Sequence, residues 1–342
     1  MAVVSHDRLQ QFAAQLIEAV GSPSESAQVV ASHLVSANMA GHDSHGVVRL
    51  LEYCQHAKQG YVNPQETPVI VRETPTTALV DGNLTWGAVV SRFAMNLAIE
   101  KATHCSISAV SVKNAHHVGR IGVYSAMAAE LGYIGIVFCN VHGTARVAPW
   151  GGAERRLCTN PISMAIPAET GPIVVDFATS AVAEGKVRVA KLTGQEVPLG
   201  WVLDRHGEFS TNPNHAYDEG ALAPLGGDQG HKGYCLAVGL DLIGGVLSGA
   251  GCGQLSPNYG NGMMLQVIDP TVYCDREEFD QRLSQYVQYI KSARCREGVT
   301  EILMPGEKEE RLSQQHRQDG LSIADEIWKQ LEELGREFGV TA

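Results

Sequence analysis

ISAVSVKNAHHVGRIGVY, residues 107–124, places a run of alternating apolar residues before two histidines and two glycines. The alternation predicts a β-strand that passes through a glycine-containing loop into a helix. Loops that leave strand ends are common places for ligands, and glycines let the backbone approach a flat or phosphorylated one. The GxGxxG turn of Rossmann folds is absent both here and elsewhere in the chain. The stretch therefore predicts a sheet domain with a ligand loop of another kind.

The regions on either side of this stretch differ in pattern. Residues 5–60 carry apolar side chains at spacings of three and four, which predicts a lobe of three helices. After Gly60 the chain changes to short β-rich runs, with one helix near residues 88–104; the runs are PVIVRE, TTALVDGN, ISAVSV, YIGIVFCN, ISMAIP and PIVVDF. The pattern predicts an α+β fold.

The last third of the chain combines helices with one more strand. Apolar and small residues cover all sides of HKGYCLAVGLDLIGGVLSGAG, residues 231–251, which predicts a buried helix that approaches another backbone closely. MLQVID predicts a strand, and two amphipathic helices end the chain.

Composition excludes several classes of function. The 342 residues carry 26 Lys and Arg against 37 Asp and Glu, a net charge of −11 without a basic run, so we expect no nucleic-acid partner. Eight cysteines are scattered without a CxxC pair, which indicates free thiols in a reducing compartment. No targeting segment and no apolar run of about 20 residues is visible. We expect a cytoplasmic protein without membrane contact.

The familiar catalytic motifs are also missing. The chain has no GxxxxGK[ST], HExxH, GxSxG or YxxxK. The histidine pairs at residues 42 and 45 and at 116 and 117 lack the Cys, Asp or Glu companions of a metal site. We expect no metal.

AGHDSHGVVRLLEY, residues 40–53, concentrates polar chemistry in a helical region. Ser44 is placed to cap a helix that starts near His45, and His45, Arg49 and Tyr53 then share one face. An imidazole, a guanidinium fork and a phenol together suit a small hydroxy or oxo acid. The alternative is a capped helix with a solvated polar stripe.

Three further clusters have a ligand interpretation and a structural one. NAHHVGRIGVY is either a ligand loop or an ordinary turn with a surface histidine pair. In PIVVDFATS, Asp176 ends a strand and Thr179 and Ser180 are candidate helix caps; the carboxylate can hold ribose hydroxyls or orient an imidazole. In GGDQGHKGY, His231 and Lys232 precede a helix, as in a phosphate cradle or a flexible loop.

Six segments in this order resemble the type 2 malate/L-lactate dehydrogenase family over about residues 5–335. They are AGHDSHGVVRLLEY, NAHHVGRIGVY, VAPWGG with TNPISMAIP, VVDFATSAVAEGK, PLGGDQGHKGY and LMPGEKEE. The resemblance implies a non-Rossmann nicotinamide-binding domain with a mainly antiparallel sheet, over residues 76–269. It also implies a helical domain, residues 1–75 joined by 270–342, and a homodimer.

The resemblance implies an enzyme that interconverts a 2-hydroxycarboxylate and a 2-oxocarboxylate with NAD or NADP. His45 and His117 are then the two acid/base candidates, Arg49 holds the substrate carboxylate, and Ser44 and Tyr53 are further substrate contacts. The residues that line the cofactor are His45, Gly119, Arg120, Ile121, Val174, Val175, Asp176, Phe177, Ala178, His231, Lys232, Asn261, Gly306, Glu307, Lys308 and Glu309.

Some questions stay open at this point. The same site can reduce a cyclic imine carboxylate, such as a piperideine or pyrroline carboxylate, and a catalytically silent nucleotide-binding protein is a further alternative. The sequence does not choose the acid, the cofactor, the stereochemistry or the proton-donating histidine. His142, in the loop before APWGG, is expected to make a local loop contact only.

Overall fold

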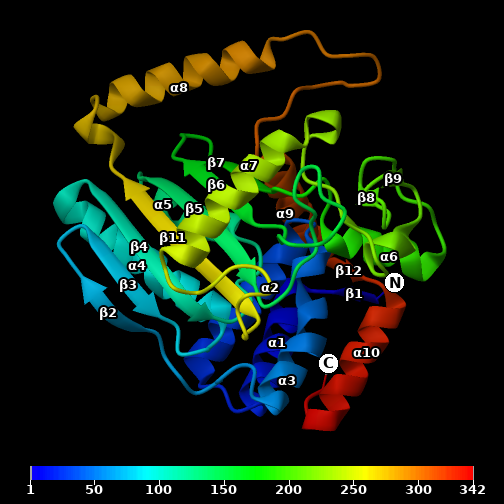
Figure 1. Cartoon of the computed structure of the whole chain (residues 1–342). Coiled ribbons are helices and arrows are strands. Elements are labelled where there is room, and N and C mark those ends of the chain that lie inside the picture. The colour runs from blue at the N-terminus through cyan, green and yellow to red at the C-terminus, as the bar shows by residue number, and fades with distance from the viewer. Residues whose placement is uncertain (1, 342) are drawn as a thin grey trace.

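A seven-stranded sheet organises the middle of the chain (Figure 1). The structure is a computed structural model and describes residues 2–341. In spatial order the strands are β2 (Val69–Glu73), β3 (Thr77–Asp81), β4 (Ile107–Ala115), β11 (Gly260–Ile268), β5 (Ile134–His142), β6 (Pro161–Ile166) and β7 (Ile173–Ala178). All neighbours pair antiparallel except β3 and β4, which are parallel. The strands predicted from the sequence are confirmed.

Helices cover both faces of this sheet. α4 (Gly87–Cys105) and α5 (Gly122–Glu130) pack on one face, where Val110, Met263 and Leu265 form part of a fully buried core. α7 (His231–Leu240) continues as a π-helical segment, Asp241–Val246, on the other face. The α4 helix confirms the one predicted near residues 88–104.

The prediction of a buried helix over residues 231–251 is wrong in one respect. The helix exists, and its glycines do allow a close approach, since a Cβ on Gly244 would lie 3.0 Å from the Asn140 main-chain nitrogen. However, Leu242, Val246 and Leu247 are 55%, 62% and 63% exposed. The helix lies on the outside of the sheet, so only one of its sides is covered.

The two ends of the chain meet in a helical layer. α1 (His6–Ala19), α2 (Ser24–Met39) and α3 (Leu50–Gln59) confirm the predicted three-helix lobe. Near the C-terminus, α9 (Glu307–Asp319) packs on α2, α10 (Asp325–Phe338) packs on α1 and α3, and β12 (Leu321–Ile323) pairs with β1 (Ala2–Val4). Leu9, Leu34, Leu50 and Leu331 are fully buried in this layer.

α8 (Arg276–Lys291) follows the 3₁₀ turn Pro270–Val272 and stands away from the body of the molecule (Figure 1). None of its described residues is buried. It therefore does not join the helical layer as α9 and α10 do. The division of the chain into two domains stays a prediction.

A small third unit lies beside the sheet and the helical layer. It contains α6 (Glu184–Thr193), a three-stranded sheet and two 3₁₀ turns, and has its own buried core around Val187 and Leu222. The strands are β8 (Val202–Leu203), β9 (Phe209–Ser210) and β10 (Ala221–Leu222), and the turns are Pro213–Ala216 and Gly227–Gln229. The start of α6 reaches the helical layer, since a Cβ on Gly185 would lie 2.9 Å from the Ser44 Cβ.

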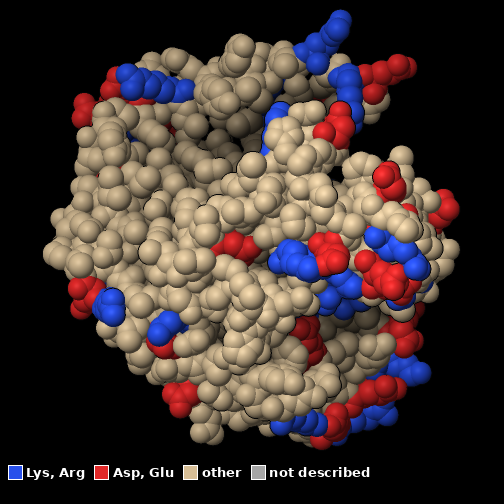
Figure 2. Space-filling model, in the orientation of Figure 1, with Lys and Arg blue, Asp and Glu red and all other residues tan. Residues whose placement is uncertain are grey.

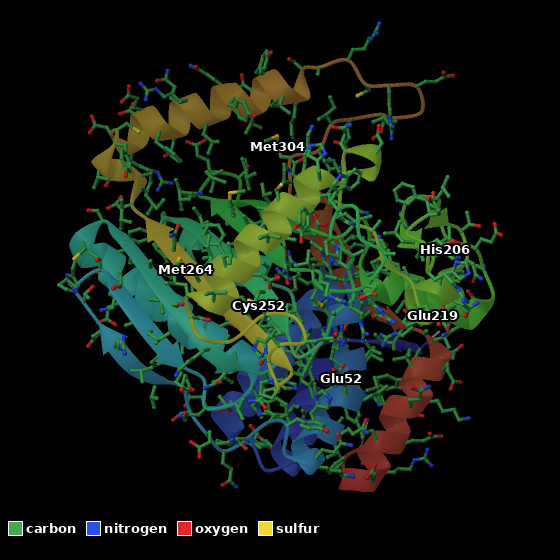
Figure 3. The ribbon with its side chains drawn as sticks, in the orientation of Figure 1. Glu52, His206, Glu219, Cys252, Met264 and Met304 are labelled. Carbon is green, nitrogen blue, oxygen red and sulfur yellow. The ribbon has the colours of Figure 1, made fainter. Side chains whose placement is uncertain are left out.

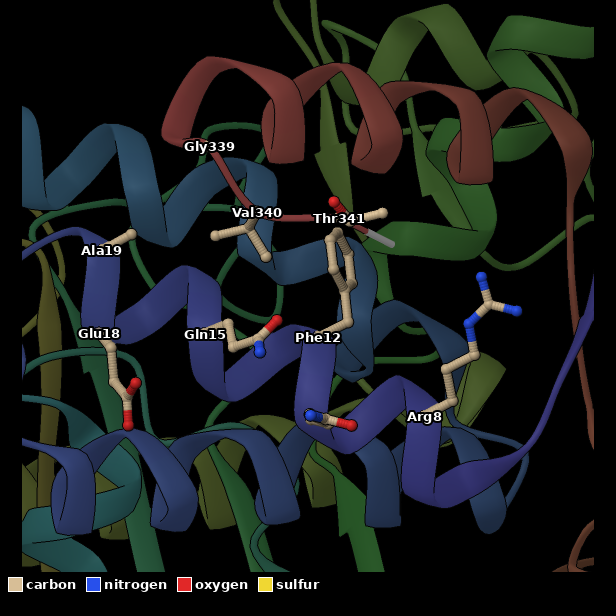
Figure 4. A pocket seen from close by; sticks show the side chains of 9 residues that line it. Arg8, Phe12, Gln15, Glu18, Ala19, Gly339, Val340 and Thr341 are labelled. Carbon is tan, nitrogen blue, oxygen red and sulfur yellow. The ribbon is translucent and has the colours of Figure 1, made fainter.

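The surface has few features that suggest function by themselves. Within residues 2–341 no helix is long and apolar enough to cross a membrane. An open hollow between α1 and the last residues of the described chain is lined by Arg8, Gln15, Glu18 and Val340 (Figure 4). This hollow contains none of the residues that the sequence singled out.

Candidate active site

Residues 40–53 do not form the capped helix that the sequence predicted. α2 ends at Met39, and two 3₁₀ turns, Asp43–His45 and Val47–Arg49, precede α3 at Leu50. Ser44 therefore caps no helix, and its Oγ lies 3.0 Å from Nδ1 of His45 instead. Since His45 lies outside α3, the predicted common face of His45, Arg49 and Tyr53 is also wrong.

Asn38 holds these turns in place. Its Oδ1 accepts a hydrogen bond from the Val47 N–H at 2.8 Å, and its Nδ2 donates to Asp43 Oδ1 at 2.7 Å. A Cβ on Gly46 would overlap the Asn38 amide, so the turn requires glycine there. Asn38 is part of the helical pattern of α2, and nothing in the sequence separated it from other polar residues of that helix.

Arg49 is fixed at the start of α3. Its Nε donates to the Ser44 carbonyl oxygen at 2.7 Å, and its Nη1 donates to Glu52 Oε2 at 2.7 Å. Figure 3 labels Glu52 on α3. Burial acts to lower the pKa of Arg49, but Glu52 beside it raises this pKa overall, so the guanidinium keeps its charge. Within the described chain Nη2 forms no hydrogen bond, which leaves one edge of the fork for an anion.

His117 and His45 lie together although 72 residues of chain separate them in the sequence. Their ring centroids are 5.7 Å apart and their planes are inclined by 20°. The Tyr53 hydroxyl lies 2.8 Å from Nδ1 of His117 and 3.3 Å from the His117 carbonyl oxygen. His117 is 9% exposed, so the alternative of a surface histidine pair is wrong.

Both rings are neutral in this arrangement. Burial, and next the Arg49 charge, lower the pKa of His45 to about 3 and hold the pKa of His117 well below its ordinary value. Burial raises the pKa of Tyr53, so the phenol stays protonated. In the described chain, Nδ1 of His45 is bound to Ser44 Oγ and Nδ1 of His117 to the Tyr53 hydroxyl. The Nε2 atoms of both rings form no hydrogen bond in that part of the chain.

His116, which precedes His117 in the sequence, contacts different residues. Its Nε2 lies 2.8 Å from His56 Nδ1, and its ring packs edge-on against Trp86 and Tyr53. Burial lowers its pKa to about 3. His116 thus fills the interior behind the site, and only His117 reaches His45.

Asn261 holds the loop that carries His117. Its Oδ1 accepts from the Val118 N–H at 3.0 Å and its Nδ2 donates to the Asn140 carbonyl oxygen at 2.8 Å. The sequence predicted that Asn261 lines a cofactor, but both polar groups of this buried side chain are bound to protein. Its visible role is to join β11 to the loop.

The end of that loop contacts β7, and β7 in turn contacts the start of α9. The Gly122 N–H, at the start of α5, donates to Asp176 Oδ2 at 2.9 Å, so the Asp176 carboxylate lies at the N-terminus of α5 and not at that of the helix after its own strand. Gly306, at the start of α9, packs on Val174 of β7. Gly119 has a φ of +72°, and a Cβ on it would overlap His33 Nε2. The contacts bring three of the predicted cofactor segments together.

This arrangement fits a negatively charged ligand with flat groups. Among residues 2–341, Arg120 Nε is fully buried without a hydrogen bond, and its ion pair with Asp176 Oδ2 is long, at 3.8 Å. In the same part of the chain His33 Nε2 is also buried without a hydrogen bond. Bare glycine backbone and a cationic N–H group that makes no hydrogen bond are features that suit a dinucleotide.

Comparison with known proteins agrees with this geometry. A sequence profile described as malate/L-lactate dehydrogenase matches residues 4–332. The chain belongs to the malate/L-lactate dehydrogenase family.

Family relatives and structures match almost the whole chain. Malate dehydrogenase of Pyrococcus horikoshii is 37% identical over 98% of this chain and 96% of its own. Hydroxycarboxylate dehydrogenase B of Escherichia coli K12 is 33% identical, over 97% and 93%. The crystal structure of malate dehydrogenase from Entamoeba histolytica superposes with a TM-score of 0.94 at 31% identity, covering 100% and 99%. A more distant structure, the Δ1-piperideine-2-carboxylate reductase of Pseudomonas syringae pvar. tomato, has a TM-score of 0.86 at 28% identity, covering 98% and 100%.

Some predicted site residues of this family member lie apart from the loop. His231 and Lys232 are exposed at the start of α7, where His231 packs edge-on against Trp150. The Glu307 carboxylate is bound to Lys291 and to the Met304 N–H. Glu309, in contrast, lies 3.6 Å from His42 and connects α9 to the turns before α3.

Two smaller expectations have opposite outcomes. Thr179 and Ser180 cap no helix, because α6 begins at Glu184, and their hydroxyls donate to main-chain oxygens nearby. His142 makes a loop contact as expected, but with a loop distant in sequence, since its Nδ1 lies 2.7 Å from the Asn258 carbonyl oxygen. Among residues 2–341 no group of three or more His, Cys, Asp or Glu side chains is arranged to hold a metal ion.

Proposed function

We propose that the protein is a nicotinamide-dependent dehydrogenase that interconverts a 2-hydroxycarboxylate and a 2-oxocarboxylate. The observation that carries the proposal is the fixed guanidinium of Arg49 next to the stacked rings of His45 and His117. A carboxylate bound to Arg49 lies beside a titratable nitrogen, which is what a 2-hydroxy acid requires. Membership of the malate/L-lactate dehydrogenase family supports the same reaction.

His117 is the proposed acid and base. The Tyr53 hydroxyl can donate its proton to the His117 carbonyl oxygen while its own oxygen accepts from Nδ1–H. This arrangement keeps Nδ1 protonated, so Nε2 is the atom that accepts the substrate hydroxyl proton in oxidation and returns it in reduction. His45, with Nδ1 against Ser44 Oγ, packs on that ring and limits its rotation.

The charge of Arg49 and the burial of His117 act together. Both lower the pKa of the imidazole, which favours the neutral base needed for oxidation. A bound substrate carboxylate offsets the Arg49 charge and raises that pKa again, so a proton becomes available for reduction. Substrate binding therefore shifts the pKa of His117 in the direction that reduction of the oxo acid requires.

A nicotinamide cofactor, NAD or NADP, supplies or accepts the hydride when it is bound. We place it against Gly119–Ile121, Val174–Ala178 and Gly306–Glu309, because Gly122 and Gly306 both contact β7 and, within residues 2–341, the buried Arg120 Nε makes no hydrogen bond. His45 packs on His117, two residues before Gly119, and so adjoins this set, whereas His231 and Lys232 are exposed at the start of α7. The nucleotide domain is then of a non-Rossmann type, built on a mainly antiparallel sheet.

A panel of 2-oxo acids with NADH and with NADPH, followed by absorbance at about 340 nm, tests the function. Oxidation of either cofactor that depends on the oxo acid supports the proposal. Cofactor binding without turnover of any acid contradicts it. A chelator in parallel assays should leave the rate unchanged.

Reduction of a cyclic imine carboxylate is the second candidate. The structural similarity to a Δ1-piperideine-2-carboxylate reductase favours it, and the site has the same two requirements for that substrate. Arg49 would bind the carboxylate, and His117 would stand near the imine nitrogen. Assay of Δ1-piperideine-2-carboxylate with the same enzyme batch distinguishes the two.

We also infer a homodimer in the cytoplasm. Exposed apolar side chains on and after the π-helical segment lie on a face with few charges (Figure 2); they are Leu242, Val246, Leu247 and Leu255. On α8, Tyr286 and Tyr289 are also exposed. A second copy of this chain would cover them. Light scattering coupled to gel filtration measures the mass, and a monomer would contradict the dimer.

The cytoplasmic location is inferred from the cysteines, because all eight are free thiols, as in a reducing compartment.

A further inference from the structure

Arg146 is half-buried and, among the described residues 2–341, its guanidinium has no partner. The residue lies in the loop after β5, where its main-chain N–H donates to the Leu157 carbonyl oxygen and its carbonyl oxygen accepts from the Leu222 N–H, both at 2.8 Å. Its backbone is therefore fixed on both sides. In the described part of the chain its guanidinium forms no ion pair and no hydrogen bond. A charge that is partly removed from water without a counter-ion costs free energy, which a bound anion recovers.

One set of contacts connects the loop of Arg146 to Tyr259. Three residues before Arg146, a Cβ on Gly143 would lie 2.6 Å from the Tyr259 Cα, so this loop packs on the backbone of Tyr259. The Tyr259 ring packs on His56 and His116, with centroids 5.8 and 6.2 Å apart. Burial raises the pKa of the Tyr259 phenol, and the charges of Arg49 and Arg146 both act to lower it. The two guanidinium groups therefore lie within electrostatic reach of one phenol.

A second set of contacts reaches Arg146 from the other side. The Tyr217 hydroxyl donates to Glu184 Oε1 at 2.7 Å, and the next residue, Gly185, packs on Ser44. Arg146 also acts to lower the pKa of Tyr217, although burial raises that pKa overall. The charge of Arg146 thus acts both on Tyr217, which is bonded to the start of α6, and on Tyr259, on which the loop of Arg146 packs.

We propose that Arg146 binds the second anionic group of a substrate that carries two. The inference rests on the proposed function, in which Arg49 holds the carboxylate next to the reacting carbon. A terminal carboxylate or sulfonate can accept two hydrogen bonds from the planar guanidinium, whereas an apolar tail leaves it unpaired. The preferred substrate class is therefore a dianionic 2-oxo acid and the matching 2-hydroxy acid.

Oxaloacetate and pyruvate form a matched pair for the test, because they differ only by the terminal carboxylate. We expect the wild-type enzyme to have the higher kcat/KM for oxaloacetate. Arg146→Gln should lower that kcat/KM by about 10- to 100-fold, in the range of a hydrogen bond to a charged group, and should change kcat/KM for pyruvate by less than about 3-fold. Arg146→Lys, which keeps the charge but loses the fork, should retain part of the preference.

Arg188→Gln is the control, because Arg188 is exposed on α6 and also acts on Tyr217. An equal loss in this variant would mean that overall positive potential, and not Arg146, selects dianions. If Arg146→Gln leaves the ratio of kcat/KM for oxaloacetate to kcat/KM for pyruvate unchanged, or lowers both values equally, the role of Arg146 is overturned while the dehydrogenase function stands. A wild-type enzyme that reduces neither acid refutes the proposed function itself. Melting temperatures of all variants identify a folding defect.

Discussion

The Tyr53 hydroxyl lies 2.8 Å from Nδ1 of His117 and 3.3 Å from the carbonyl oxygen of the same residue, across 64 residues of sequence. One phenol thus both accepts from the imidazole and donates to the backbone beside it. The bond fixes the orientation of the ring and the nitrogen that carries the permanent proton. The proposed proton transfer at Nε2 depends on this pair.

Tyr53→Phe removes the acceptor for Nδ1–H and keeps the aromatic packing. We expect kcat to fall by about 10- to 100-fold with little change in KM, because the base is then poorly oriented. The variant should also lower the pKa seen in the pH profile of hydroxy-acid oxidation, since the imidazolium loses a hydrogen bond. Tyr61→Phe, at a 59% exposed tyrosine after α3, is the control. Equal profiles for the two variants would contradict the role of Tyr53.

Replacement of each histidine by Asn separates their roles. His117→Asn should lower kcat by about 100- to 10,000-fold, the usual contribution of a general acid or base. His45→Asn should cost less, because His45 packs against the proton donor in the proposed mechanism. Steady-state kinetics in both directions provide the measurement. The reverse order would assign the proton to His45.

Arg49→Lys keeps the positive charge but loses the planar fork. We expect KM for the oxo acid to rise about tenfold or more, because Lys cannot bind Ser44, Glu52 and a carboxylate in the same geometry. The dissociation constant of the cofactor alone, from fluorescence titration, should stay unchanged. Weaker cofactor binding with an unchanged KM for the acid would remove Arg49 from the substrate site.

Gly119→Ala and Gly151→Ala form a matched pair in the left-handed region. Their φ values are +72° and +80°, so both substitutions should cost about 1–2 kcal/mol of folding stability. A Cβ on Gly151 meets no atom within 4 Å, whereas one on Gly119 meets His33. Gly119→Ala should therefore lower the melting temperature further and weaken cofactor binding. Equal effects on both measurements would show that His33 moves freely.

Stability should fall in mild acid. Burial lowers the pKa of His33 to about 4, from an ordinary value of about 6.5, and lowers the pKa of His45 and His116 to about 3. The unfolded chain thus binds more protons in this range, so the contribution of His33 is complete above about pH 6.5 and is lost as the pH falls to about 4. Urea unfolding at several pH values measures the slope, which His33→Gln should reduce. A free energy of unfolding that is constant between about pH 4 and 7 would contradict this account.

The strands and most of the helices followed from the sequence, and the family resemblance named both His45 and His117, because apolar periodicity and family motifs are local signals. The predicted cap at Ser44 failed because Asn38, from the preceding helix, supplies the hydrogen bonds that fix two 3₁₀ turns instead. The partners of Tyr53 and Asn261 depend on chain segments far away in sequence. No spacing rule reports such contacts. The same holds for Arg146, because the lack of an ion pair at its guanidinium within the described chain is known only once its neighbours are placed.

β11 pairs with both β4 and β5, although it is encoded well after them, and Asn261 at its start holds the loop of His117. During synthesis from the N-terminus, β4 and β5 therefore wait with open edges until residues 260–268 leave the ribosome. Pairing between strands that are distant in sequence is slow, and exposed edges are prone to aggregate. The nascent chain thus has a late and vulnerable closing step, and the loop that carries His117 acquires its final shape only at that step.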